Sequence, residues 1–124
     1  MPNTTTSFTV TVHDTDQANR LALRFVAAAL DSGHRIEQVF FYHDGVNIAA
    51  AARLPTQEDP TFSIDWPTLA KRGKFPLNVC VAAAQRRGLA EDQPATVKPG
   101  YELIGLGVHI AALTAADRVV TFSN

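Results

Sequence analysis

Short runs of β-branched and aromatic residues alternate with longer stretches of helical spacing along the 124 residues of this chain. The runs predict strands, which fall at 8–12, 36–42, 77–81, 101–104 (a short edge strand) and 118–122. The stretches between them predict helices. The first helix follows the capping residues 13–16 and runs to about 32. The others occupy 48–53, 65–72, 82–87 and 108–116. Alternation of this kind implies right-handed crossovers. The sequence therefore predicts an α/β fold, a three-layer α/β/α arrangement with a mostly parallel sheet of four to five strands.

Local signals refine these boundaries. The predicted apolar face of the first helix consists of Leu21, Phe25, Val26 and either Ala28 or Ala29. Gly33 stands just past the end of this helix and stops it. Ser63 or Asp65 is predicted to cap the helix that ends near 72. Loops are predicted at 43–47, 56–61 (acidic) and 89–100, and no internal repeat or linker divides the chain. We expect a single domain over 1–124, with residues 1–6 as a flexible tail.

Composition and charge exclude several classes of function. Hydrophobic residues make up 46% of the chain, charged residues 19%, and the formal net charge is −1. This profile is typical of a soluble globular protein. It supplies no basic field for binding nucleic acid directly and no polybasic segment for a membrane surface. The polar N-terminus lacks the features of a secretory signal, so we expect a cytoplasmic location.

Cys80 is the only cysteine and lies in the segment PLNVCVAAAQRRG (76–88), where a predicted strand meets a predicted helix. A thiol reacts as its thiolate, and the free amide N–H groups of a first helical turn lower a thiol pKa. A lone cysteine cannot form an internal disulfide, so any covalent chemistry must involve a small molecule or another protein. The alternative is an inert thiol, because free cysteines usually pack as small hydrophobes.

Other polar side chains also follow predicted strands and should share the carboxyl edge of a parallel sheet with Cys80. They are His13 and Asp14 after the first strand, and His43 and Asp44 after the second. His43 could accept a proton and Asp44 could orient it. A hydrogen-bonded turn closed by Asp44 and Gly45 is at least as consistent with the residues.

Two arginines close the segment that begins at Cys80. Arg86 and Arg87 could hold an anionic sulfur or dock a partner, or could simply form a solvated helix end. The spacing of Cys80 and Arg86 matches that of thiolate phosphatases, but the intervening VAAAQ favours helix over a phosphate-binding loop.

Nucleotide and zinc sites are not indicated. The turn after the first strand has no glycine, and Gly105 and Gly107 lack the third glycine of a dinucleotide-binding turn. The four histidines have no metal-ligand spacing, so neither a metal nor a cofactor is expected. His34 is interpreted as a helix cap or surface residue, His109 as a packing or interface residue, and Trp66 as a core or interface anchor.

Four segments together resemble a known family: FFYHDGVN (40–47), CVAAAQRRG (80–88), GLG (105–107) and ADRVV (116–120). Their order and spacing are similar to those of the DsrE/TusD sulfurtransferase subunits, over most of the chain. Of the two fold types considered, flavodoxin-like and DsrE-like, the resemblance implies the second.

The resemblance implies a sulfur relay. Cys80 would receive sulfane sulfur from a TusA-like donor, hold it as a persulfide and pass it to a TusE/DsrC-like acceptor, with His43 and Arg86 as secondary aids. It also implies a heterohexamer with DsrF/TusC-like and DsrH/TusB-like sister subunits. The sulfur would serve 2-thiouridine formation in tRNA or dissimilatory sulfur oxidation.

Two alternatives stay open. The chain could be a non-catalytic scaffold subunit of the same assembly, with Cys80 buried. A flavin- or nucleotide-binding module of flavodoxin type is disfavoured, because the phosphate-binding loop is missing.

Overall fold

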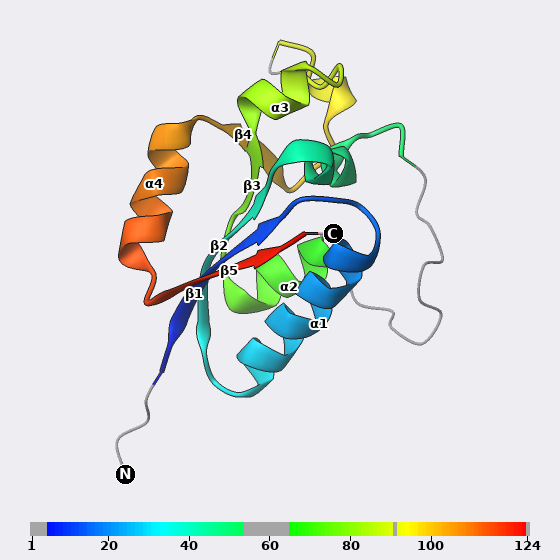
Figure 1. The fold of residues 1–124 in the computed structure, drawn as a ribbon. Helices are drawn as coiled ribbons and strands as arrows, with labels where there is room; N and C mark the ends of the chain where they lie inside the picture. The colour runs from blue at the N-terminus through cyan, green and yellow to red at the C-terminus, as the bar shows by residue number, and fades with distance from the viewer. Residues whose placement is uncertain (1–4, 54–64, 91, 124) are drawn as a thin grey trace.

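A computed structural model describes residues 5–53, 65–90 and 92–123. Five parallel strands form one sheet in the order β4-β3-β2-β1-β5 (Figure 1). The strands are β1 (Ser7–Val12), β2 (Arg35–Phe41), β3 (Leu77–Cys80), β4 (Tyr101–Ile104) and β5 (Arg118–Phe122). The helices are α1 (Gln17–Asp31), α2 (Trp66–Gly73), α3 (Val81–Gln85) and α4 (Leu106–Ala115), with 3-10 turns η1 (His43–Ala49) and η2 (Pro94–Thr96). The three-layer fold with a parallel sheet is confirmed, and its strand order differs from the 2-1-3-4-5 order of flavodoxins.

One face of the sheet is apolar and is covered by α1 and α2 (Figure 1). Phe8 meets Phe25 of α1 edge to face, and Phe41 meets Trp66 of α2 in the same way. The fully buried strand side chains on this face are Val10, Val12, Val39, Phe41, Leu77 and Val79. Burial of each such side chain stabilises the folded state by about 1.5–3 kcal/mol. The main core therefore lies between the sheet and these two helices.

The opposite face of the sheet is polar where α4 covers it. Thr9, Gln38 and Asn78 are buried there, and Thr9 Oγ1 donates a hydrogen bond to the Ala112 carbonyl of α4 at 3.0 Å. Side chains alternate along a strand, so Cys80, two residues after Asn78, belongs to this same face. The thiol therefore lies on the α4 side of the sheet.

Helix ends and helix contacts follow the sequence signals closely. Asp65 accepts a hydrogen bond from the Thr68 amide at 2.9 Å, as predicted for the cap of α2. Trp66 is buried and donates from Nε1 to Asn19 Oδ1 at 2.7 Å, which makes it a core anchor. The other proposed cap, Ser63, and the acidic loop 56–61 lie outside the described residues.

Three local predictions were wrong. The segment 43–47 is part of η1 rather than a loop, and no helix spans 48–53, because η1 ends at Ala49. Beyond that point the backbone pairs with a distant loop: Ala51 N donates to Thr96 O at 2.9 Å, and Lys98 N donates to Ala49 O at 2.8 Å. The first helix turns Leu21 outward, where it is 47% exposed, because smaller residues, among them Ala18, Ala22 and Val26, form its buried face.

No helix within the described ranges is both long enough and apolar enough to span a membrane.

Candidate functional site

Cys80 is the last residue of β3 and the N-cap residue of α3. It therefore lies at the strand-to-helix junction that the sequence predicted, at the carboxyl edge of the sheet. Ile104 of β4 is its register partner on one side. On the other side β2 pairs with β3 up to Phe41 and Val79, so Tyr42 follows directly beside Cys80. Cys80 is buried, with only 6% of the residue exposed.

Three rings cluster at the same edge, at the ends of β1 and β2. The rings of Tyr42 and His43 stack with centroids 4.1 Å apart, and His43 meets His13 edge to face at 4.9 Å. His13 also meets Tyr42 at 5.9 Å. The sheet order, which places β1 next to β2, thus brings the two predicted histidines together and places Tyr42 between them and Cys80.

A close backbone approach holds this cluster in position. Gly45 donates its amide to the carbonyls of both Tyr42 (2.8 Å) and His13 (3.1 Å). A Cβ atom at Gly45 would lie 2.1 Å from the Val12 carbonyl oxygen, which is far inside contact distance. His43 has a φ of 49°, in the left-handed region that non-glycine residues adopt rarely. The bend of η1 is therefore tightly specified.

Arg87 connects η1 with the helix that follows Cys80. Its Nη2 and Nε atoms donate to Asp44 Oδ1 at 2.8 and 3.2 Å, and Nη1 donates to the Ala83 carbonyl at 2.9 Å. Asp44 therefore pairs with Arg87 and does not bond to His43 in any contact that the structure shows. Arg86, the arginine expected to assist Cys80, is exposed, and its role stays a prediction.

His13 and Asp14 form a partly buried polar pair beside the rings. Burial lowers the pKa of His13, the neighbouring His43 lowers it further, and Asp14 opposes both effects. The Oδ2 atom of Asp14 is buried and has no hydrogen-bond partner among the described residues. The sequence placed His13 at this edge of the sheet but assigned it no catalytic role. Its position directly after the first strand indicated that it lies at the carboxyl edge of the sheet. Its contact with His43, however, depends on the strand order, which the sequence did not give.

His109 takes part in a polar network under α4. Asn78 Nδ2 donates to Gln38 Oε1 at 2.8 Å, and Gln38 Nε2 lies 2.8 Å from His109 Nδ1. Because Oε1 of Gln38 accepts from Asn78, the Nε2 group of Gln38 faces His109 and donates the hydrogen bond. Nδ1 of His109 therefore accepts this bond and is unprotonated. The imidazole also stacks on Phe40, with centroids 3.7 Å apart. His109 is thus a hydrogen-bonded packing residue.

The stability of the fold is expected to decrease as the pH falls below 6.5. Burial lowers the pKa of His109 from its ordinary value of 6.5, so below that value the unfolded chain binds more protons than the folded chain and unfolding is favoured. Urea denaturation of the wild type and of His109→Gln over this pH range measures the effect. The variant should show a shallower loss of stability, and an unchanged pH dependence would contradict the prediction.

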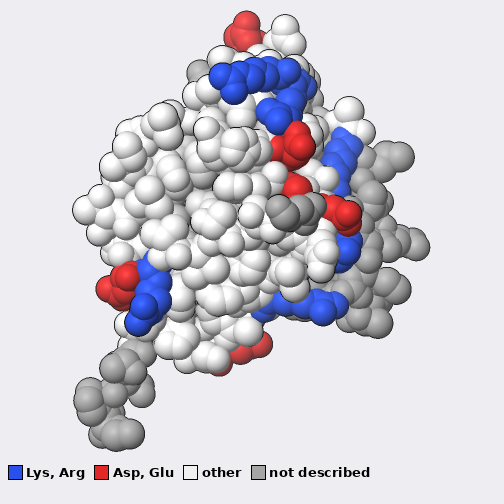
Figure 2. All heavy atoms as spheres, viewed as in Figure 1, with Lys and Arg blue, Asp and Glu red and all other residues white. Residues whose placement is uncertain are grey.

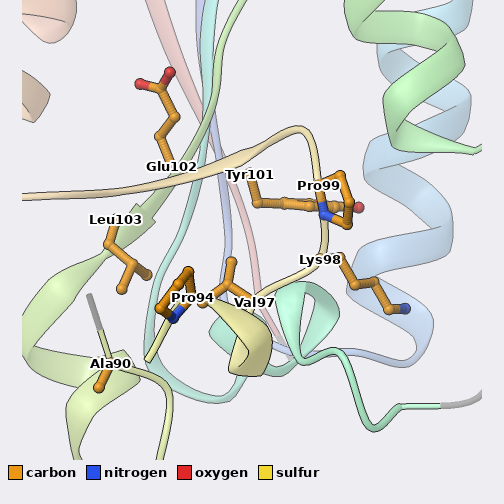
Figure 3. Close-up of a pocket in the computed structure, with 8 residues that line it drawn as sticks. All are labelled: Ala90, Pro94, Val97, Lys98, Pro99, Tyr101, Glu102 and Leu103. Atoms are coloured by element: carbon orange, nitrogen blue, oxygen red, sulfur yellow. The ribbon is translucent and has the colours of Figure 1, made fainter. Parts of the chain in front are cut away.

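A separate cavity of about 540 Å³ lies beside β4. Its lining residues are Ala90, Pro94, Val97, Lys98, Pro99, Tyr101, Glu102 and Leu103. Figure 3 shows Leu103, Pro94 and Val97 gathered together, whereas Glu102 points away from them. Burial raises the pKa of Tyr101 and lowers that of Lys98. Cys80 and the three rings do not line this cavity, so it is distinct from the site at the sheet edge.

Within the described ranges no group of three or more histidine, cysteine or acidic side chains is placed to hold a metal ion.

The chain is similar in sequence to a known family and to several named proteins. A sequence profile of the DsrE/DsrF-like family matches residues 6–122. The chain belongs to this family. The DsrE protein of Allochromatium vinosum is 40% identical over 116 residues, which cover 87% of this chain and 89% of that protein. A protein of Pseudomonas aeruginosa named sulfurtransferase TusD homolog is 42% identical over 115 residues, or 86% and 88% of the two chains.

Solved structures agree with DsrE/DsrF-like family membership at the level of the fold. The ychN protein from E. coli superposes with a TM-score of 0.69 and 17% identity, covering 95% of this chain and 99% of that one. A protein of unknown function from Methanobacterium thermoautotrophicum gives a TM-score of 0.64, also with 17% identity, over 94% and 98% of the two chains. The resemblance drawn from the sequence segments is therefore confirmed for family and for fold.

Proposed function

We propose that this protein is a sulfurtransferase that carries sulfane sulfur as a persulfide on Cys80. The observation that supports it most directly is the position of the only thiol, at the end of β3 and the start of α3. Ligands and reacting groups of parallel sheets gather at this carboxyl edge. Relatives of similar length that are about 40% identical carry the name sulfurtransferase, among them TusD of Proteus mirabilis.

The proposed chemistry requires one thiol and no oxidant or reductant. The Cys80 thiolate attacks the terminal sulfur of a donor persulfide, the donor's S–S bond breaks, and the donor leaves as a thiolate. The thiolate of an acceptor then attacks the outer sulfur of the Cys80 persulfide. The new S–S bond forms on the acceptor, and Cys80 regains its thiolate.

The residues around Cys80 are assigned supporting roles. Ala83 and Ile104, the register partner of Cys80, are buried and would shield the outer sulfur from oxidants. The Arg87–Asp44 pair links η1 to α3, since Arg87 also bonds to the Ala83 carbonyl, and would help to fix the position of Cys80 relative to η1. His43 is proposed as a secondary aid through its place in the ring cluster, and Arg86 as an exposed contact for an incoming partner.

We assign the protein the partners that the family resemblance implies. A TusA-like protein would supply the sulfur and a TusE/DsrC-like protein would accept it, within an assembly that includes DsrF/TusC-like and DsrH/TusB-like sister subunits. The sulfur would then enter 2-thiouridine of tRNA or dissimilatory sulfur oxidation. The cytoplasmic location expected from the sequence stays a prediction.

Mass spectrometry tests the sulfur-carrier role. The purified protein is incubated with a persulfide-loaded TusA-like donor, and its intact mass and its peptides are then measured without reductant. We expect a gain of one sulfur atom, located on the peptide that contains Cys80 and removed by dithiothreitol. An unchanged mass, or sulfur found on another peptide, would contradict the proposal.

The small exposure of Cys80 favours a second candidate, a scaffold subunit with an inert thiol. At 6% exposure the sulfur could serve mainly as packing. Alkylation by iodoacetamide at mildly acidic pH separates the two roles, because only an accessible thiol with thiolate character reacts quickly there. Rapid labelling supports the carrier, and labelling that requires denaturant supports the scaffold.

A further inference from the structure

Three side chains at the carboxyl edge of the sheet form a row across neighbouring strands. The register of β1 and β2 ends at Val12 and Phe41, so His13 stands beside Tyr42, and the centroids of their rings are 5.9 Å apart. The register of β2 and β3 in turn places Tyr42 beside Cys80. Side chains alternate along a strand, so all three belong to the α4 side of the sheet. We call His13, Tyr42 and Cys80 the edge row.

The edge row leads from the interior of the protein to its surface. Cys80 is buried, Tyr42 and His13 are partly buried, and His43, whose ring contacts both of the latter, is exposed. A thiol that comes to a persulfide on Cys80 along this row passes the His13 imidazole. Imidazole is the side-chain group that ordinarily accepts a proton near neutral pH, so His13 is placed to act on an incoming thiol.

The dimensions of the edge row suit a proton transfer that accompanies sulfur transfer. Neighbouring strands are about 4.8 Å apart, so the backbones at His13 and Cys80, two strands apart, are separated by about 10 Å. A persulfide bond is about 2 Å long, and an attacking sulfur waits about 3–3.5 Å from the atom that it attacks. A base reaches about 3 Å to the atom that carries the proton. An acceptor thiol therefore fits between the outer sulfur on Cys80 and the His13 imidazole.

The groups nearest to His13 prepare it to accept a proton. Burial and the neighbouring His43 lower the pKa of His13, so its imidazole is largely neutral at pH 7. Asp14 acts in the opposite direction, and one of its carboxylate oxygens, Oδ2, is buried without a hydrogen-bond partner among the described residues. This carboxylate would stabilise the imidazolium once the proton has arrived.

The other elements at this edge add little charge near His13. On η1 the carboxylate of Asp44 is paired with Arg87, β2 contributes the phenol of Tyr42, and residues 119–122 of β5 are uncharged. Residues 105–116 contain no lysine, arginine, aspartate or glutamate and only one histidine, His109. Figure 2 accordingly shows a broad area without charged side chains where Figure 1 draws α4. The proton affinity of His13 is therefore controlled mainly by His43 and Asp14.

We propose that His13 is the general base that removes the proton from the thiol of the sulfur acceptor. This inference rests on the proposed function of Cys80 as a persulfide carrier. The acceptor's S–H proton passes to the His13 imidazole, and the resulting thiolate attacks the outer sulfur of the Cys80 persulfide. A new S–S bond forms on the acceptor, the persulfide S–S bond breaks with its electron pair on Cys80, and His13 releases the proton to solvent. His43 acts through His13 and is a positioning residue.

A general base changes the pH dependence of the transfer rate in a characteristic way. An ordinary cysteine thiol has a pKa of about 8.5, so only about 3% of it is thiolate at pH 7. Without a base the rate follows this thiolate and rises about tenfold per pH unit up to the pKa of the thiol. With His13 as the base, the rate depends on neutral imidazole and intact thiol, so it is nearly level between their two pKa values.

The test is the pH profile of sulfur transfer from the loaded protein to a small thiol. Cys80 is loaded by the persulfide donor, and the loss of one sulfur atom to N-acetylcysteine amide is followed by intact mass between about pH 5 and pH 9.5. The wild-type rate should be nearly level from about pH 6.5 to 8. The His13→Gln variant should be about tenfold slower at pH 7, should rise steeply with pH, and should equal the wild type at about pH 9.5, where the thiol ionises without help.

Two further variants complete the experiment. His34→Gln is the matched control, because it makes the same exchange just before β2, at the opposite edge of the sheet, where His34 accepts a hydrogen bond from the Thr6 amide. It should keep the wild-type profile. His43→Asn suits the left-handed backbone at this position, with its φ of 49°. It removes a neighbour that lowers the pKa of His13, so the acidic limb of the profile should move to higher pH.

Two results would overturn the role of His13. One is a His13→Gln variant that is as fast as the wild type at pH 7, and the other is a variant slowed equally at both ends of the profile, as a structural disturbance would cause. If His13→Gln lost its thermal transition, His43→Asn would decide, and an acidic limb that stayed in place would overturn the proposal. Failure of Cys80 to load at all would instead overturn the proposed function, and this inference with it.

Discussion

The Cys80→Ser variant is expected to take up no sulfur from a persulfide donor. A serine hydroxyl does not attack sulfur at neutral pH, and Cys80 is the only thiol in the chain, so no neighbouring residue can replace it. The side chain is small and makes no capping hydrogen bond to α3, so the folded structure should persist. Intact mass after incubation with the donor measures the loss, and thermal denaturation confirms folding.

Arg86→Gln tests the proposed partner contact in the same experiment. It removes a charge from the exposed end of the same segment while leaving the thiol in place, so it should still form the persulfide, at a reduced rate if Arg86 contacts the partner. A gain of sulfur by Cys80→Ser would remove Cys80 from the mechanism. If Cys80→Ser lost both sulfur uptake and its thermal transition, the variant would have a folding defect. The same two measurements on Cys80→Ala would then test the role of the thiol in a second variant.

Gly45→Ala is expected to lower the free energy of unfolding by about 3 kcal/mol, near the upper end of what overpacking a buried position costs. The added Cβ would lie 2.1 Å from the Val12 carbonyl oxygen and 3.0 Å from its carbonyl carbon. These are backbone atoms of β1, so they cannot rotate away as a side chain could. Relief of the clash must displace η1 from β1 and separate the rings of His13 and His43. Urea denaturation measures the change.

Gly107→Ala is the matched control for this prediction. A Cβ at Gly107 meets no atom within 4 Å, and the residue lies inside α4. The same methyl addition should therefore stabilise the protein by about 0.5–1 kcal/mol, because glycine is a poor helix former. If Gly45→Ala were as stable as the wild type, the close approach between η1 and β1 would not exist in the folded protein.

Local sequence patterns predicted most of the fold because each element carries its own signal. The strand at Leu77–Cys80 is mostly apolar and ends at a helix-forming alanine run, and the cap at Asp65 is a short-range hydrogen bond. Such signals act within a few residues and do not depend on what the element later contacts. The failed helix at 48–53 shows the limit, since its backbone groups bond to the loop around Thr96 and Lys98 instead.

Amphipathic faces were predicted less well than the elements themselves. Leu21 is apolar and occupies a helical spacing, yet small alanines allow α1 to lie close to the sheet and leave Leu21 in solvent. Conversely α4 is apolar all round, so its spacing alone could not tell which side faces the sheet. Hydrogen bonds from Thr9 and Gln38, residues far away in the sequence, decide that orientation.

The order of strands and helices, the family and the location of the only thiol at a strand end were all determined by the sequence alone. The tertiary structure decided which residues surround that thiol. Only the order β4-β3-β2-β1-β5 places Tyr42 beside Cys80 and His13 against His43, and pairs Arg87 with Asp44. The physical reason is that these contacts join residues up to 43 positions apart, and such contacts depend on how whole elements pack rather than on the preferences of neighbouring residues.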